Sequence, residues 1–399
     1  MWVVYATIFL LGVAYGSSLS VTPLQLAHVH FSKRAIGGLA AFFASGLVLG
    51  SVPSGAIVRA LGAKRTVLGC LVLYAAAVGL FPLQTGFWGA AGVRALDGAS
   101  SVGVWVACET VLLARSDAKN KAFVMSFYGM AIAIGYVVGS GVARALTLFV
   151  AYRGVFFAAA AIALVTAAVA TALLDRNAER PAGGAAHEPA HAEPSTQDDG
   201  AQAGPRLGAW ALFWRVKTSC LATFSYGWFQ SSVVLFLPLY LVADKGVPEK
   251  DTILMTAFFA GGMLVFPIFA GRIDDAIGHL RTMTGLATVG LAMIFGFVWI
   301  SSWPLMLAAI TVAGATLASI SPVSLALQGH IAEPRDYSRV NAIYNACYAV
   351  GMLVGPPLTS VVFEARGGRA MLFSFAAMWG AFIALTIVFR RDDPRARRA

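Results

Sequence analysis

Three ionisable side chains, Arg94, Asp97 and Glu109, lie inside a stretch of sequence that is otherwise apolar. Arg94 and Asp97 are three residues apart, and on a helix this spacing lets the two side chains touch. Burial favours protonation of a carboxylate and a neighbouring cation opposes it, so a small rearrangement of such a pair can load or release a proton. The pair is therefore a candidate proton-coupling site. A static, self-neutralising pair and direct contact with a charged substrate are the alternatives.

The composition of the chain indicates which surroundings hold these charges. Of its 399 residues, 58% are hydrophobic and 12% are charged, and the mean hydropathy is +0.75. Ordinary soluble domains have about 25% charged residues, so this chain cannot cover a water-facing surface. Soluble enzymes, nucleic-acid-binding proteins and disulfide scaffolds are excluded, although the net charge of +10 would otherwise suggest a nucleic-acid partner. The expected partner is a lipid bilayer.

The chain contains enough apolar segments to cross a membrane many times. A membrane-crossing helix needs about 20 mainly apolar residues, and continuous rather than alternating apolar runs favour helices over barrel strands. We therefore expect an all-α membrane protein. Twelve spans are predicted, at 2–24, 35–58, 66–84, 86–113, 122–148, 153–174, 217–242, 252–270, 282–300, 303–327, 340–363 and 370–389.

One long polar segment divides these spans into two sets of six. Residues 175–208 contain four prolines and six acidic residues, and such a segment cannot bury enough surface to fold. We expect a flexible linker there, between bundles at 1–174 and 209–390, with a basic tail at 391–399. Loops on the side of the linker hold twenty of the 29 lysines and arginines, against eight on the other side. This bias predicts cytoplasmic termini and linker, in the inner membrane.

Depth separates the three intramembrane charges. With a helix beginning at Gly86 and a rise of about 1.5 Å per residue, Arg94 lies roughly 12 Å and Asp97 roughly 16 Å into a core about 30 Å thick. Glu109, at roughly 35 Å by the same count, reaches the cytoplasmic mouth. A charge at the bilayer centre costs at least about 2.5–3.5 kcal/mol, so the central pair is a functional candidate.

The two halves of the sequence resemble each other at one ungapped spacing of 216 residues, which we call the repeat offset. The hexapeptide at 41–46 (AFFASG) recurs at 257–262 (AFFAGG), and Gly98-Ala99 recurs as Gly314-Ala315. The repeat offset also carries residues 55, 57 and 62, and residues 128, 135 and 139, onto identical residue types. Duplicated halves around a midplane site are typical of secondary transporters.

Loop motifs add a resemblance to a known family. Residues 55–65 (GAIVRALGAKR) resemble the loop signature between the second and third helices of the major facilitator superfamily, and 271–281 (GRIDDAIGHLR) resemble its second-half counterpart. Arg94-Ala-Leu-Asp97-Gly98 is similar to the fourth-helix motif, and Gly351-x-x-x-Gly355-Pro356 to the glycine–proline helix motif. The resemblance implies two pseudo-symmetric six-helix bundles and a secondary transporter without a cofactor.

The chain departs from the family pattern at three positions. Arg59 stands where the family has a carboxylate, Asp97 replaces the usual glutamine, and Gly139-Ser140 stands where antiporters have glycine–proline. Each loop signature still offers charges for a latch that closes the cytoplasmic gate. We expect two such gating groups: Glu109 with Arg59, Lys64 and Arg65, and Asp275 with Arg272 and Arg281.

The resemblance also implies that spans one, four, seven and ten line a central cavity, and span eleven adds a polar stripe. The polar and aromatic residues of these spans are the candidate substrate-binding residues, with bonding between helices as the alternative for each. As a group they suit a mostly apolar ligand with a few polar handles. They are Tyr15, Ser18, Trp105, Tyr226, Gln230, Asn341, Tyr344, Asn345 and Tyr348.

These features predict a secondary active transporter, and not an enzyme. We expect a monomer that works by alternating access and exports small organic molecules or metabolites in exchange for protons. A proton-coupled importer of a small organic anion or nutrient is the first alternative, and a non-transporting membrane sensor is the second. The sequence contains neither the GxxxxGK[ST] loop of an ATP-driven pump nor the HExxH motif of a metalloprotease, and we expect no metal site.

Overall fold

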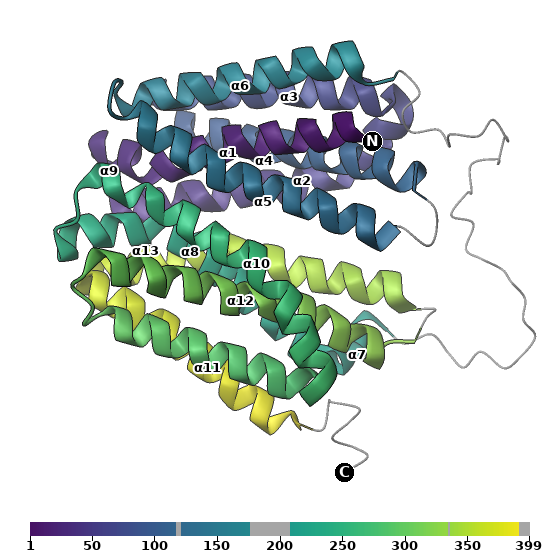
Figure 1. Ribbon diagram of the computed structural model, residues 1–399, viewed down its shortest axis with the longest axis vertical. Coiled ribbons are helices and arrows are strands. Elements are labelled where there is room, and N and C mark those ends of the chain that lie inside the picture. The colour runs from purple at the N-terminus through teal and green to yellow at the C-terminus, as the bar shows by residue number, and fades with distance from the viewer. Residues whose placement is uncertain (117–120, 176–207, 334–335, 391–399) are drawn as a thin grey trace, which may run out of the picture.

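The computed structural model describes residues 1–116, 121–175, 208–333 and 336–390, and these residues are almost entirely helical. The expected linker lies outside the described residues apart from positions 175 and 208, and the whole of the expected basic tail at 391–399 lies outside them. Helices of the first half form the upper bundle in Figure 1, and helices of the second half form the lower bundle. The described part of the chain therefore has the expected arrangement of two helical bundles.

The first half consists of six long helices and one short 3-10 turn. The long helices are α1 (Trp2–His28), α2 (Lys33–Leu61), α3 (Ala63–Leu80), α4 (Phe87–Ala114), α5 (Lys121–Leu146) and α6 (Tyr152–Leu173), and η1 (Phe81–Leu83) follows α3. Each long helix coincides within a few residues with a predicted span, as the continuous apolar runs require. The Ser32 hydroxyl accepts a hydrogen bond from the Ala35 amide and so begins α2.

The second half repeats this order with two additional short helices. It comprises α7 (Ala209–Arg215), α8 (Lys217–Lys245), α9 (Glu249–Thr252), α10 (Leu254–Ile277), α11 (His279–Phe297), α12 (Trp303–Ile331) and α13 (Tyr337–Val388). The 52 residues of α13 contain the last two predicted spans, because the backbone breaks at Gly367, where φ is 81°. Ten described helices are long and apolar enough to cross a membrane, and the helix pair around α10, bent by 45°, is an eleventh. With α13 counted as two, the twelve predicted spans are all found. The short α7 was not predicted.

The duplicated sequence produces duplicated contacts. Gly46 of α2 packs against the backbone of Ala95 in α4, and Gly262 of α10 packs against Thr311 of α12 in the same way. The repeat offset relates one pair to the other. Gly62 and Gly278, also equivalent, each end one helix and begin the next with a positive φ, of 82° and 95°, a backbone region that favours glycine. The internal repeat is therefore a structural one.

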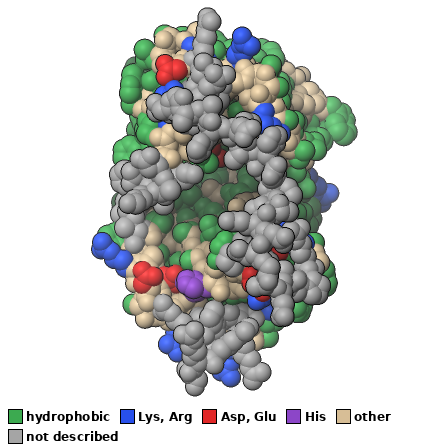
Figure 2. Space-filling view, turned by 90° about the vertical axis from the view of Figure 1, so that its right-hand side faces the viewer, with side chains coloured by type: hydrophobic (Ala, Val, Ile, Leu, Met, Phe, Trp, Pro, Cys, Tyr) green, Lys and Arg blue, Asp and Glu red, His purple; other side chains and the backbone are tan. Residues whose placement is uncertain are grey.

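The bundle has two ends that differ in their connections. We call the end that carries residues 1, 175, 208 and 390 the linker end, which is on the right in Figure 1. The opposite end, where α1 is joined to α2 and α5 to α6, is the far end. Seen from the linker end in Figure 2, the surface is hollowed between the two halves.

Candidate functional site

The central charges form a close ion pair inside the first half. Arg94 Nη1 lies 2.6 Å from Asp97 Oδ2, and the side chains are only 12% and 8% exposed. Ser101 Oγ lies 3.5 Å from the other carboxylate oxygen of Asp97. All three residues belong to α4, so the helical spacing alone brings them together, and the contact between Arg94 and Asp97 was expected from the sequence. The contact is present, and its role in proton coupling is a proposal.

An aromatic cluster adjoins this pair. Tyr15 of α1 lies at its centre, with ring centroids 6.0 Å from Phe43, 6.2 Å from Tyr74, 6.3 Å from Trp105 and 5.2 Å from Tyr136. These rings come from α1, α2, α3, α4 and α5. The cluster thus contains two of the candidate substrate-binding residues. Ser18, a third candidate, is buried and donates to the carbonyl oxygen of Tyr15 at 3.1 Å.

The cluster extends towards the second half. Tyr136 lies within electrostatic range of Tyr226 and Tyr348. These two second-half rings stack with their centroids 6.1 Å apart, and the Tyr348 hydroxyl donates to Gln230 Oε1 at 2.7 Å. Three more candidate substrate-binding residues are therefore placed together, opposite the first-half cluster. The arrangement supplies flat apolar faces with a few polar groups.

The remaining candidates on α13 divide into two kinds. The Tyr344 hydroxyl lies 2.9 Å from Ser321 Oγ and 3.0 Å from Ser324 Oγ, both on α12. Tyr344 therefore joins two helices, which is the alternative role expected for it from the sequence. Asn341 and Asn345 are exposed. Their side chains can therefore be reached by a ligand, whereas the Tyr344 side chain is buried.

The predicted gating groups lie at the linker end, where this structure is open. Glu109 is half-buried and lies beside Tyr128 of α5. Lys64 Nζ donates to the carbonyl oxygens of Thr171 at 2.7 Å and Leu174 at 2.6 Å, and so caps α6. The other four predicted gating bases and the carboxylate of the second latch are exposed: Arg59, Arg65, Arg272, Arg281 and Asp275. The latches remain a prediction for a state in which this end is closed.

The second loop signature contains a buried chain of polar contacts that sequence reasoning missed. Asp274, not Asp275, is the buried carboxylate there, and its oxygens lie 2.7 and 2.8 Å from His279 Nδ1. His279 Nε2 in turn lies 3.1 Å from His330 Nδ1 of α12. Two adjacent aspartates gave no signal in the sequence to distinguish the buried one from the exposed one.

Contacts at the far end join the two halves, and these were also missed. Arg144 of α5 donates from Nε and Nη2 to Asp251 Oδ1, at 3.1 and 2.7 Å. The Tyr152 hydroxyl donates to Glu249 Oε2 at 2.9 Å, and His28 Nε2 lies 3.0 Å from the same oxygen. These contacts close the far end, whereas Figure 2 shows the hollow at the linker end.

A third ion pair at the far end, between Arg34 and Glu364, also joins the two halves. The backbone amide of Arg34 donates to Glu364 Oε2 at 3.0 Å, and Arg34 Nε lies 3.4 Å from Glu364 Oε1. In every far-end ion pair between the halves that the described residues show, the base comes from the first half and the carboxylate from the second. The sequence did hold a signal, because the first half has no acidic residue in any far-end loop.

In residues 1–116, 121–175, 208–333 and 336–390, no group of three or more histidine, cysteine, aspartate or glutamate side chains is placed to hold a metal ion. The site offers instead one buried ion pair, two facing groups of aromatic rings, and a closed and an open end.

Comparisons with known proteins agree with this arrangement. The family model of the Major Facilitator Superfamily matches residues 4–248 and 219–399. An uncharacterized MFS-type transporter of Enterobacter sp. (strain 638) is 23% identical over 389 residues, which cover 96% of this chain and 94% of that protein. An uncharacterized MFS-type transporter of Yersinia pestis is 23% identical over 382 residues, 94% of this chain and 91% of the relative.

Solved structures share the fold at low sequence identity. The nucleoside transporter NupG superposes with a TM-score of 0.76 at 13% identity, covering 98% of both chains. A D-xylose-proton symporter gives 0.73 at 16% identity, covering 97% of this chain and 96% of the other. A bacterial homolog of the human lysosomal transporter Spinster, in an inward-facing and occupied conformation, gives 0.70 at 14% identity, covering 97% and 93%. The chain is thus a multi-pass membrane protein and belongs to the major facilitator superfamily of transporters.

Proposed function

We propose that the protein is a secondary active transporter that exports small organic molecules across the cytoplasmic membrane in exchange for protons. The observation that carries this proposal is the buried Arg94–Asp97 pair, which adjoins an aromatic cluster reaching towards the other half. Ionisable residues in membrane-spanning helices are costly and mark ion pathways and proton relays. Loop charges support a cytoplasmic linker end, so the far end faces outward in this proposal. We further propose that the protein acts as a monomer whose partners are its substrate and protons.

The proposed cycle alternates the two ends. In the present state the far end is closed by pairs such as Arg144–Asp251 and the hollow lies at the linker end. Opening the far end requires these pairs to break. The latches at the linker end then close the opposite side, with Glu109 and Asp275 as their carboxylates. Access changes sides in this way while the two facing aromatic groups stay between the halves.

The proton step uses the central pair. In the proposed cycle, the contact between Arg94 Nη1 and Asp97 Oδ2 belongs to the state in which Asp97 is ionised. A proton entering from the outer side adds to a carboxylate oxygen of Asp97, which ends the charge attraction to the guanidinium. Release of that proton to the inner side restores the ion pair. The inward movement of the proton drives export, because the substrate moves outward in the step in which the protein returns without its proton.

The two facing aromatic groups between the halves support a mostly apolar substrate. Aromatic faces such as those of Tyr15 and Tyr226 take up apolar groups, and the Gln230 amide offers a polar handle. Arg94 is occupied by Asp97, which argues against an organic anion held by Arg94. Import of a neutral hydroxylated solute is the second candidate, because the hydrogen-bonded Tyr348 and Gln230 offer polar partners. The nucleoside transporter and D-xylose-proton symporter named above share this fold.

Proteoliposomes with an internal pH dye test the proposal. Ethidium, uridine, xylose and benzoate are added in turn, and proton movement is recorded for the wild type and for Asp97→Asn. We expect the wild type to move protons with ethidium, and the variant to exchange ethidium without moving protons. Proton-driven accumulation in Asp97→Asn equal to that of the wild type would reject Asp97 as the coupling site.

The same assay separates the alternatives. Everted membrane vesicles that accumulate ethidium under a proton gradient support export, whereas uridine or xylose uptake by right-side-out vesicles would assign import instead. Binding of a probe without flux under any gradient would overturn transport in favour of a sensor. Retention of the wild-type melting temperature by Asp97→Asn confirms that a loss of coupling is not a loss of fold.

A further inference from the structure

The surroundings of the ion pair in the first half have a counterpart in the second half that lacks charge. Around Arg94 and Asp97 lie Phe43 of α2, Phe81 of η1 and, beyond Phe81, Phe156 of α6. The Phe81 and Phe156 ring centroids are 5.4 Å apart. These five residues form one connected group of contacts inside the first half.

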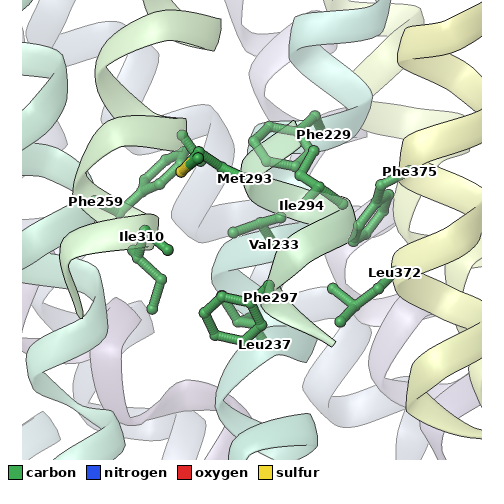
Figure 3. Close-up of a pocket in the computed structure, with 12 residues that line it drawn as sticks. Phe229, Val233, Leu237, Phe259, Met293, Ile294, Phe297, Ile310, Leu372 and Phe375 are labelled. Carbon is green, nitrogen blue, oxygen red and sulfur yellow. The ribbon is translucent and has the colours of Figure 1, made fainter. Parts of the chain in front are cut away.

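The repeat offset carries all five positions onto the lining of one cavity in the second half. The counterparts are Phe259, Phe297, Ile310, Ala313 and Leu372, and the cavity among them measures about 30 Å³ (Figure 3). Both of the phenylalanines that contact Arg94 are retained, whereas Ile310 stands in the place of Arg94 and Ala313 in the place of Asp97. An apolar cavity is therefore left where the first half holds its ion pair.

Among the described residues, the retained phenylalanines contact a cation only in the first half. The Arg94 guanidinium carbon lies 4.5 Å from the ring centroid of Phe43 and 5.6 Å from that of Phe81. Both rings are buried, and cation–π attraction is strongest where the partners are shielded from water. Arg94 is thus held on three sides, by two rings and by the Asp97 carboxylate.

Phe43 also touches the aromatic cluster. Its ring centroid is 6.0 Å from that of Tyr15, a candidate substrate-binding residue. A continuous series of contacts therefore runs from Tyr15 through Phe43 and Arg94 to Asp97. Movement of Tyr15 when a substrate binds would displace Phe43 and, with it, the guanidinium.

We propose that Phe43 and Phe81 are positioning residues that hold Arg94 against Asp97, and that Phe43 links this pair to the substrate pocket. The inference rests on the proposed proton coupling through Asp97. The duplicated half shows that packing alone does not require the pair, since Phe259 and Phe297 persist beside an apolar cavity. The proposed proton-coupling pair, Arg94 and Asp97, thus lies in the first half only. The second half has the apolar residues Ile310 and Ala313 at the equivalent positions.

The ionisable groups that face the pair are few in the described chain. They are the hydroxyl groups of Tyr15 on α1, Tyr74 on α3 and Tyr136 on α5. Tyrosine titrates well above neutral pH. These hydroxyls therefore do not account for a conformational response near neutral pH, and the part of that response that is lost in Asp97→Asn reports on the Arg94–Asp97 pair.

The test uses the full chain in lipid nanodiscs, with spin labels attached at Thr85→Cys and Ser301→Cys. The four native cysteines are replaced by serine, so that only these two positions are labelled: Cys70, Cys108, Cys220 and Cys347. The label positions are exposed loop residues, one in each half, related by the repeat offset. Their distance distribution at a series of pH values gives the fraction of molecules with an open far end. The midpoint of this pH response is the measured quantity, and it needs no identified substrate.

Phe43→Leu should move the midpoint upward by about one pH unit, a tenfold change in proton binding, because a loosened guanidinium stabilises the carboxylate less. Phe43→Tyr, which keeps the ring, should restore the wild-type midpoint. Phe81→Leu should give a smaller shift in the same direction and provides a second variant if Phe43→Leu does not fold. Phe259→Leu is the matched control, since its ring faces Ile310, and it should leave the midpoint unchanged.

The outcomes separate this inference from the proposed function. A wild type without any pH response, or an Asp97→Asn variant that retains it, would reject proton coupling through Asp97. A response lost in Asp97→Asn, with identical midpoints for Phe43→Leu, Phe81→Leu and Phe259→Leu, would leave coupling intact and overturn the positioning role. A downward shift in Phe43→Leu would also overturn that role.

Discussion

The Arg144–Asp251 pair offers a direct test of how the far end is held closed. Asp251→Asn keeps the shape of the side chain and removes its charge, so Arg144 loses an ionic partner that it binds through two nitrogen atoms. Because this pair joins α5 of the first half to α9 of the second half, its loss weakens the closed state only. We expect more molecules with an open far end.

The size of the effect follows from the exposure of the pair. Hydrogen bonds to charged groups contribute about 1.5–3 kcal/mol, whereas exposed ion pairs contribute about 0.2–1 kcal/mol. The Arg144 and Asp251 side chains are 27% and 33% exposed, so an intermediate value of about 1–2 kcal/mol applies. This free energy corresponds to a change of about 5–30-fold in the ratio of open to closed molecules.

The assay is the distance between spin labels at Thr85→Cys and Ser301→Cys in nanodiscs. Arg215→Gln serves as the control, because Arg215 pairs with Glu333 at 3.2 Å within the second half. Arg144→Gln should resemble Asp251→Asn, and the double variant should add little to either. An Asp251→Asn distribution that coincides with that of Arg215→Gln would refute the claim that this pair holds the far end closed.

Two further substitutions test the linker-end gate and the close helix packing. Glu109→Gln should increase the fraction of molecules open at the linker end, because the proposed latch loses its carboxylate; cysteine accessibility at that end measures this, and unchanged labelling would make Glu109 a structural residue only. Gly46→Val should lower the free energy of unfolding by about 1–3 kcal/mol, an overpacking cost, since its side chain would meet the backbone of α4. Gly69→Val has open space, and equal melting temperatures for the two variants would contradict the packing argument.

The sequence predicts the helices and the repeat because both depend on local pattern. Continuous apolar runs indicate the spans, and the repeat offset anticipates equivalent contacts such as those of Gly46 and Gly262. The Arg94–Asp97 contact was also predictable, since both residues share one turn of α4. In these cases the interacting residues are near neighbours in sequence or are related by a fixed spacing.

The missed features depend on contacts between distant segments. Arg144 and Asp251 are 107 residues apart, and the sequence identifies them only as loop charges. The aromatic contacts of Arg94 come from α2 and η1, which no spacing rule connects to α4. Apolar helices contain many phenylalanines, so the two that touch the guanidinium could be identified only after the chain was folded.

Alternating access itself is the central claim, and paired distances at both ends test it most directly. Labels at Ser116→Cys and Ala332→Cys, equivalent positions at the linker end, are compared with labels at Thr85→Cys and Ser301→Cys at the far end. Across a pH series, we expect the linker-end distance to shorten in the same proportion of molecules in which the far-end distance lengthens. Ends that open together, or two distances that never change, would contradict it.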